Sequence, residues 1–332
     1  MRNILCVTLI ALLGGCTSTS VTEKYQDKRN DIINVKDKVI EFETGNVLIG
    51  SVSRLYMSNK CLLIADHKSV DKQIHIFNKN DFSYLTSIGN FGEGPEEITV
   101  MGCLAIDEAH HQLYVSDHAK QKIFSYDMDS VMVDSLYKPQ VKTAMNETLF
   151  PSEYQYINDT LSIAVLIKPT STSTFNQFLA RWNMNTGEMI PMKYTHPDIQ
   201  KKRITFAASE KAGIYVECYT RHDLMTICSL DGELLYNIYG PDWDGGNGNK
   251  LQSFGTVMIG NDKIFVSYCG EDYARDSFPT KILVFDLEGN YLKTLETGYK
   301  ISDCCYDSFN NRIILSLNDV VQFAYLDIDG II

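Results

Sequence analysis

Long apolar runs and positive charge are both scarce in this sequence. After residue 13, no segment approaches the roughly 18 consecutive apolar residues that a membrane-spanning helix requires, so we expect a globular body outside the bilayer. Lysine and arginine number 30 against 42 acidic residues, a formal net charge of −12, and no basic cluster breaks this excess. Because such a charge repels the phosphate backbone, we expect no nucleic acid among the partners.

Motifs of common active sites are also absent. The sequence contains neither the H-E-x-x-H pattern of zinc hydrolases nor the G-x-S-x-G pattern of serine hydrolases. No two of the nine cysteines have the C-x-x-C spacing of zinc or thioredoxin-like sites. The cysteines beyond Cys16 fall mostly within strand patterns, where a free thiol behaves as a small buried apolar group. We therefore expect structural thiols, and no motif identifies a catalytic residue.

The sequence does contain a repeat. One short apolar strand pattern occurs six times, at intervals of 48 to 53 residues, in the copies Leu62–His67, Leu113–His118, Leu161–Leu166, Ile214–Tyr219, Ile264–Cys269 and Ile313–Asn318. Periods of this length are typical of propeller blades. These strands are apolar on both faces, as expected when each is pressed between two neighbouring blades. We expect the core to include Leu62, Ile64, Tyr114, Val115, Ile214, Val216, Phe265 and Val266.

Each copy is flanked by further strand patterns, which gives four antiparallel strands per repeat. As outermost strands we expect Tyr84–Ile88, Val131–Leu136, Leu234–Tyr239 and Tyr291–Leu295. The sixth repeat lacks an outer strand before Ile332, whereas Val35–Glu43 has strand composition and belongs to no repeat. We therefore predict an all-β, six-bladed β-propeller whose ring is closed by this N-terminal strand in the last blade, which removes an exposed sheet edge.

The amino terminus has the pattern of an export signal. Arg2 precedes the apolar run Ile4–Leu13, which is too short to span a bilayer and ends in Leu13-Gly14-Gly15-Cys16. This ending resembles the lipobox of bacterial lipoproteins, in which the cysteine becomes the acylated first residue. The resemblance implies that Cys16 is lipidated and that its acyl chains anchor the protein stably. The alternative is an ordinary signal peptide that is cut nearby.

These patterns divide the chain into three parts. Residues 1–15 are expected to be a lipoprotein signal peptide. Residues 16–31, which are mostly polar after Cys16, are expected to be a lipidated flexible tether. Residues 32–332 are expected to form the propeller.

Two stretches resemble known propellers. Residues 115–127, Val-Ser-Asp-His-Ala-Lys-Gln-Lys-Ile-Phe-Ser-Tyr-Asp, look like the blade pattern of NHL-type propellers, and Gly89–Ile98 is similar to a glycine-rich loop of six-bladed, TolB-like lipoproteins of Bacteroidetes-type envelopes. The loop departs from that pattern at Glu96, where a glycine is usual, and at Ile98, where a phenylalanine is usual. The resemblance implies a lipoprotein of the cell envelope, held at the outer membrane, with its body in the periplasm or at the surface. It implies little chemistry, because the family is largely uncharacterised.

Ligand contacts are expected on one face of the ring. Connections from the second to the third strand of a blade, and from the fourth strand to the next blade, emerge on the same side. The unusual loops all fall there, at residues 66–72, 92–97, 168–175, 241–250 and 269–279. Long loops on a rigid scaffold often carry function. From them we expect ligand contacts by Glu93, Glu97, Trp243, Tyr273 and Arg275.

Two acidic patterns suggest a metal, although a structural explanation suffices for each. Asp66 and Asp117 each precede a histidine at equivalent strand ends, but the other four repeats lack this pair, so we expect aspartates that fix turns. The loop from Asp242 to Asn249 alternates oxygen ligands as calcium loops do, yet Ser253 stands where a bidentate glutamate is needed. We therefore expect no metal or other cofactor, with calcium as the alternative.

The sequence thus predicts a non-enzymatic binding or scaffold module for an envelope protein, peptide or glycan. The alternative is a divalent-metal hydrolase, such as a lactonase, or a lyase that acts in the central channel, as in some six-bladed propellers. A third hypothesis is a purely structural role in envelope assembly, with a stable stoichiometric partner.

Overall fold

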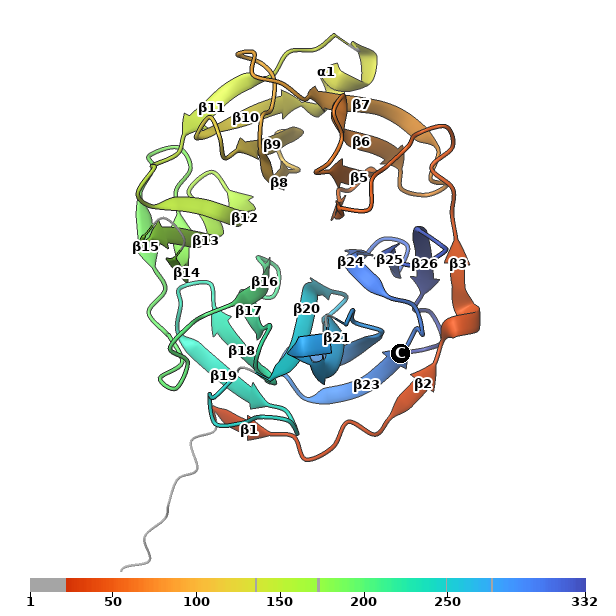
Figure 1. Ribbon diagram of the computed structural model, residues 1–332, viewed down its shortest axis with the longest axis vertical. Coiled ribbons are helices and arrows are strands. Elements are labelled where there is room, and N and C mark those ends of the chain that lie inside the picture. The colour runs from red at the N-terminus through yellow and green to blue at the C-terminus, as the bar shows by residue number, and fades with distance from the viewer. Residues whose placement is uncertain (1–21, 135, 172–173, 249, 276) are drawn as a thin grey trace, which may run out of the picture.

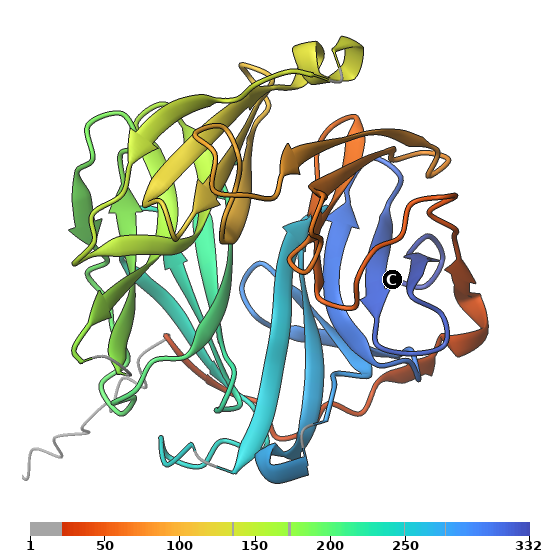
Figure 2. The ribbon, with the colours of Figure 1, turned by 45° about the horizontal axis from the view of Figure 1, so that its top comes forward.

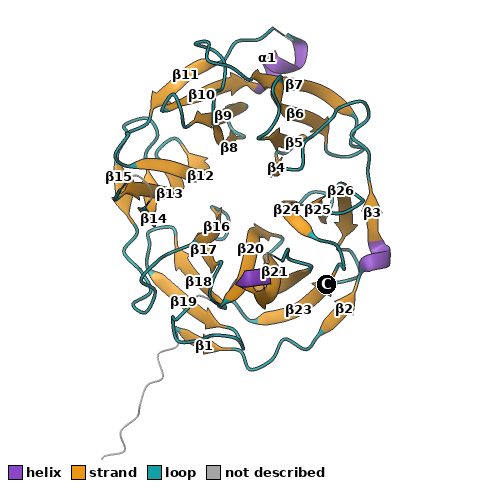
Figure 3. Cartoon of the chain, viewed as in Figure 1, coloured by secondary structure: helices purple, strands orange, loops and turns teal. Residues whose placement is uncertain are grey.

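The computed structural model describes residues 22–134, 136–171, 174–248, 250–275 and 277–332, which form a ring of six sheets (Figure 1). Regular structure is almost entirely strand, as the colours of Figure 3 show. From the channel outward, blade 1 consists of β4 (Ser53–Met57), β5 (Cys61–Asp66), β6 (Lys72–Asn78) and β7 (Tyr84–Asn90), and blade 2 of β8 (Met101–Asp107), β9 (Gln112–Asp117), β10 (Lys122–Asp127) and β11 (Gln140–Ala144). Blade 3 consists of β12 (Phe150–Asn158), β13 (Leu161–Pro169), β14 (Phe175–Trp182) and β15 (Met189–Pro191), and blade 4 of β16 (Ile204–Ser209), β17 (Ile214–Tyr219), β18 (Leu224–Ser229) and β19 (Leu234–Tyr239). Blade 5 consists of β20 (Leu251–Gly260), β21 (Lys263–Asp272), β22 (Lys281–Asp286) and β23 (Tyr291–Glu296), and blade 6 of β24 (Ile301–Asp307), β25 (Arg312–Leu317), β26 (Phe323–Asp327) and β3 (Val39–Glu41). The predicted six-bladed propeller is confirmed.

The second strand of each blade forms the core. Every residue of β5, β17 and β25 is buried, which agrees with the apolar pattern on both faces. The eight predicted core residues are all buried. The hydrophobic clusters lie between blades, where the faces of adjacent sheets pack. All seven cysteines of the described residues are buried and free, in agreement with structural thiols.

The ring is closed by the predicted N-terminal strand. Strand β3 pairs antiparallel with β26, so that Val39 lies opposite Leu326 and Glu41 lies opposite Ala324. Blade 6 therefore consists of three strands from the end of the chain and one from its beginning. The prediction of this closure from Val35–Glu43 is confirmed.

The predicted tether is wrong for its described part, residues 22–31. Strand β1 (Glu23–Tyr25) pairs in parallel with β19 of blade 4, and β2 (Ile32–Asn34) pairs in parallel with β23 of blade 5. Residues 22–43, called the belt below, thus run around the outside of three blades, in both views (Figures 1 and 2). Polar composition suggested a tether, but the free backbone groups of two sheet edges offer it hydrogen bonds. Cys16 and the signal segment lie outside the described residues.

Arg29 anchors the belt to blades 4 and 5. Its Nη1 lies 2.8 Å from Oδ1 of Asp223, with side chains 7% and 0% exposed. The guanidinium carbon lies 5.4 Å from the ring centre of Tyr268 in blade 5. Burial raises the pKa of Asp223, although the positive charge of Arg29 opposes the shift. A residue of the expected tether therefore supplies the counter-charge of a buried carboxylate.

One expected strand is a helix. The segment Val131–Leu136 was expected to be the outer strand of blade 2, but α1 (Met128–Val133) overlaps it. Asp127 caps this helix, because its carboxylate accepts a 2.7 Å hydrogen bond from the backbone N–H of Ser130. The outer strand begins later, at Gln140. The apolar residues that suggested a strand include Val131, which is buried against the blade.

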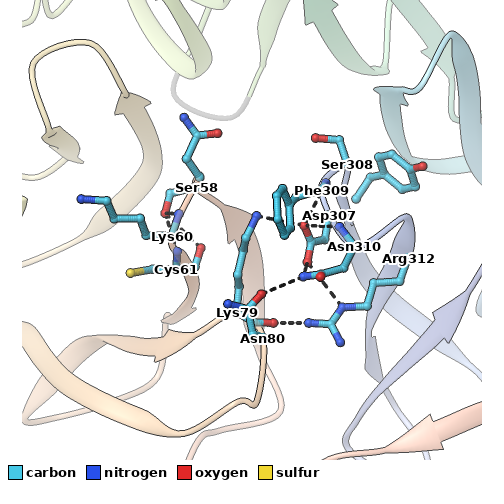
Figure 4. Close-up of polar contacts among 12 residues, drawn as sticks. Ser58, Lys60, Cys61, Lys79, Asn80, Asp307, Ser308, Phe309, Asn310 and Arg312 are labelled. Carbon is cyan, nitrogen blue, oxygen red and sulfur yellow. Dashed lines mark hydrogen bonds and ion pairs between the residues drawn. The ribbon is translucent and has the colours of Figure 1, made fainter.

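A buried polar cluster joins the last blade to the first (Figure 4). The Nζ of Lys79 lies 3.1 Å from Oδ1 of Asp307, and Nε of Arg312 lies 3.4 Å from Oδ2 of the same residue. Arg312 also donates to the carbonyl of Lys79, and its guanidinium lies 4.6 Å from the ring centre of Phe82. Blades 1 and 6 are therefore joined by charges as well as by apolar packing.

We predict that Arg29→Ala lowers the free energy of unfolding by about 3–5 kcal/mol, because it leaves the Asp223 carboxylate buried without its partner. Denaturant unfolding of the purified propeller measures this. Arg181→Ala is the matched control, since it breaks an ion pair of similar length, 2.9 Å, whose side chains are 39% and 72% exposed. The free energy of unfolding should fall by less than about 1 kcal/mol in this variant. Equal losses for the two variants would contradict the role assigned to the belt.

Candidate functional site

The chain topology sorts the loops onto two faces. The side on which the second strand turns into the third, and the fourth strand leads to the next blade, is called the loop face below. The opposite side is called the hairpin face. All five unusual loops predicted from the sequence connect strands of these two types, for example β5 to β6 and β19 to β20. They therefore share the loop face, as expected.

The loop between β7 and β8 uses one predicted ligand residue for its own structure. The carboxylate of Glu97 accepts a 2.7 Å hydrogen bond from the backbone N–H of Gly94. A Cβ at Gly92 would overlap this carboxylate, so the loop needs glycine there. The Nζ of Lys120 donates to the carbonyls of Gly94 and Glu97, both at 2.6 Å. Glu97 braces the loop, whereas Glu93 is exposed.

Trp243, a second predicted ligand residue, packs against three neighbouring rings. Its ring lies 5.0 Å from that of Tyr239, 5.6 Å from that of His196 and 5.9 Å from that of His222, measured between centroids. Burial lowers the pKa of both His196 and His222, which favours the neutral imidazole in each. This aromatic cluster fixes the loop between β19 and β20.

Tyr273 and Arg275 lie on the neighbouring loop between β21 and β22. Tyr273 is 46% exposed, and the guanidinium carbon of Arg221 lies 4.1 Å from its ring centre. Arg275 pairs with Glu271 at 2.9 Å. These residues are accessible, but they are carried by blade 5, whereas Glu93 and Glu97 lie between blades 1 and 2 across the ring (Figure 1). The structure therefore does not bring the five predicted residues into one site.

The loop face carries an apolar patch that sequence reasoning missed. Leu48, Val70 and Val320 lie on three loops of this face and are 94%, 82% and 99% exposed. We call these three residues, together with Val52 and Phe91 of the same face, which are 48% and 44% exposed, the apolar patch. Isolated exposed apolar residues are common, whereas several of them on neighbouring loops make a face a candidate for an interaction site.

Hydrogen bonds hold the loops of the apolar patch together. The backbone N–H of Gly50 donates to Oδ2 of Asp66 at 2.7 Å, and Nε2 of Gln322 donates to the carbonyl of Ile49 at 2.9 Å. The N–H of Phe91 donates to the carbonyl of Asp71 at 2.7 Å. Asp66 thus fixes a turn, as expected. No sequence signal separates the exposed Val320 from its partly buried neighbour Val321, because the geometry of the loop decides which side chain points outward.

Comparison with known proteins supports the same fold. The model of a family described as a six-bladed β-propeller, DUF5128, matches residues 17–227. The chain belongs to the DUF5128 family. No curated protein matches the sequence.

Solved structures similar to this DUF5128 protein have the same shape but little sequence in common. A Bacteroides fragilis protein named as exported has 13% identity and a TM-score of 0.57, covering 89% of this chain and 87% of that one. A member of the DUF4221 family from Bacteroides vulgatus has 11% identity and a TM-score of 0.59, covering 90% and 98%. A luciferin-regenerating enzyme has 8% identity and a TM-score of 0.58, covering 86% and 94%. At such identities the likeness shows the fold alone.

The central channel of this DUF5128 propeller has a cavity of about 390 Å³ lined by the inner strands of all six blades. Arg54 and Glu153 form an ion pair in its wall, with Nη1 and Oε1 2.9 Å apart. Asp303 is buried in the same wall and accepts 2.7 Å hydrogen bonds from the N–H of Leu55 and the hydroxyl of Thr256. Burial raises the pKa of Asp303, although Arg54 opposes the shift.

Two carboxylates of the channel wall are engaged by neighbouring groups. Glu153 accepts from Arg54, and Asp303 accepts from the hydroxyl of Thr256 and from the backbone N–H of Leu55. Within the described part of the chain, the one group of three metal-ligand residues within reach of each other is Asp107, His110 and Asp159. These lie on the hairpin face, where Asp107 already accepts hydrogen bonds from the ring and the backbone N–H of His110.

We predict that Trp243→Ala destabilises the propeller by about 2 kcal/mol, because it empties the aromatic cluster of the β19–β20 loop. Tyr273→Ala is the control on the adjacent loop, and its cost should stay within about 0.5 kcal/mol since the side chain is 46% exposed. Thermal and denaturant unfolding of both variants measure the difference. If the Trp243 variant were as stable as the wild type, the Trp243 side chain would not be needed to hold the loop and would be available for ligand contact.

Proposed function

We propose that this protein is an exported, lipid-anchored propeller that acts as a non-enzymatic binding module and holds a protein partner on its loop face. The observation that carries the proposal is the apolar patch, whose Leu48, Val70 and Val320 are almost fully exposed. The partner is an envelope protein with a complementary apolar surface.

The chemistry of the apolar patch favours a protein over a glycan. Four of its five residues are aliphatic, and aliphatic side chains have no hydrogen-bonding group for the hydroxyls of a sugar. Burying them against a second apolar surface lowers the free energy by about 25 cal/mol for each Å² of apolar area removed from water. Because the loops are already tied through Gly50, Asp66 and Gln322, little conformational freedom is lost on binding.

Lipid anchoring through Cys16 explains the sequence pattern of the amino terminus. The export-signal pattern ends in the lipobox-like Leu13-Gly14-Gly15-Cys16, and a similar structure is that of a Bacteroides fragilis protein named as exported. No helix among the described residues is long and apolar enough to cross a membrane. The resemblance to TolB-like lipoproteins of the outer membrane supports the same location.

The belt shortens the proposed tether. Six residues separate Cys16 from Glu23, where pairing with blade 4 begins. A stretch of this length reaches at most about 25 Å. The rim of blade 4 would therefore stay close to the bilayer, rather than at the end of a long flexible segment.

We expect that Cys16→Ala moves the protein from the membrane fraction to the soluble fraction of the envelope and abolishes the incorporation of labelled palmitate. Fractionation and metabolic labelling of cells expressing both forms measure this. Cys6→Ala is the control, because Cys6 lies inside the apolar run of the signal, and it should leave both readouts unchanged. A Cys16 variant that remains labelled would refute lipidation at this residue.

We expect that the double variant Val70→Asp/Val320→Asp retains its fold but loses its envelope partner, since charges introduced on the apolar patch cannot be buried without counter-charges. Chemical cross-linking in intact cells, followed by purification and mass spectrometry, compares the partners. Val133→Asp is the matched control, because Val133 is 87% exposed on α1, which connects the third strand to the fourth strand of blade 2 and therefore lies on the hairpin face. Identical cross-linked partners for the three proteins would refute the loop-face site.

A further inference from the structure

We propose that the central channel is a second binding site, for a small zwitterionic molecule of the amino-acid class. This inference does not rest on the loop-face function proposed above. It rests on one partly exposed ion pair, Arg54 with Glu153, in the wall of the channel cavity.

The cavity has the size of a small-molecule site. Its volume of about 390 Å³ lies within the 300 to 1,000 Å³ range, roughly, of such pockets. Residues of all six inner strands line it, so that its wall presents both polar and apolar groups. A few charged groups in such a wall can fix the orientation of a small ligand.

Arg54 and Glu153 leave part of their bonding capacity unused. They share one hydrogen bond, from Nη1 to Oε1 at 2.9 Å, and their side chains are 38% and 35% exposed. A guanidinium carries five N–H donors and a carboxylate carries two acceptor oxygens. Donors on the one group and an acceptor on the other therefore remain for a ligand in the channel.

The other charged residues of the lining already have partners. Asp303 accepts from the N–H of Leu55 and from Thr256, and it is 6% exposed. Glu108 accepts a 2.7 Å hydrogen bond from the N–H of Asn59, next to the hairpins of blades 1 and 2. Recognition in the channel would thus fall to Arg54 and Glu153.

This pair selects a ligand with both charges. A carboxylate can take the free N–H groups of Arg54, and an ammonium can donate to the free oxygen of Glu153. An anion alone would meet Glu153, the nearby Asp303 and the negative field of a protein with a net charge of −12. A cation alone would meet Arg54. An α-amino acid carries both charges and can therefore satisfy both groups at once.

Isothermal titration calorimetry with L-leucine and two of its analogues tests the inference on the wild-type propeller. The analogues are 4-methylpentanoate, which lacks the ammonium, and 3-methylbutylamine, which lacks the carboxylate. We expect L-leucine to bind at least tenfold more tightly than either analogue, because each analogue leaves one charge of the pair unmatched. Equal binding of an analogue, or no binding of leucine, valine, methionine or phenylalanine at millimolar concentration, would overturn the proposal.

Variants then locate the site. Arg54→Gln and Glu153→Gln should each weaken leucine binding about tenfold or more, whereas Arg181→Gln, in an exposed ion pair on the outer part of blade 3, should leave it unchanged. Circular dichroism and thermal unfolding confirm that each variant is folded. Unchanged affinity in both channel variants would place the bound amino acid elsewhere and refute the assignment.

Discussion

The pairing of β3 with β26 is the interaction on which the rest of the structure depends. Blade 6 has only three strands without it, and the ring would end in an open sheet edge. Closure also brings β24 and β4 side by side, so that the polar cluster of Lys79, Asp307 and Arg312 can form between the last blade and the first. The channel, with its wall built from six inner strands, exists only in the closed ring.

Two buried ion pairs join parts of the chain that are distant in sequence. Arg29 in the belt meets Asp223 in blade 4, and Lys79 in blade 1 meets Asp307 in blade 6. A buried charge without its partner is costly, so we interpret these pairs as ensuring that the correct segments meet.

The fold could be predicted from the sequence because it is repeated. Six copies of one buried strand pattern, together with the unmatched segment Val35–Glu43, were enough to give the blade number and the closure. The belt could not be predicted in the same way, since Glu23–Tyr25 is short and polar and its pairing partner lies more than 200 residues away. The helix α1 was missed because its apolar residues suit a strand equally well, and the cap by Asp127 is a local detail.

The candidate site was less predictable than the fold. The loop face followed from topology alone, but which residues point outward on it depends on hydrogen bonds such as the one from Gln322 to Ile49. Trp243 looked like a contact residue in the sequence and lies among three rings in the structure. The pairing of Arg54 with Glu153 joins residues 99 positions apart that belong to no common motif.

The belt has a consequence for the order in which this protein is made. Its residues emerge from the ribosome long before strands β19, β23 and β26, with which they pair. A chain of this kind cannot reach its native state during synthesis, and contacts between such distant residues form slowly. The proposed export would require the chain to stay unfolded until it has been translocated, and this connectivity would supply the delay, because the ring cannot close before its final strands are made.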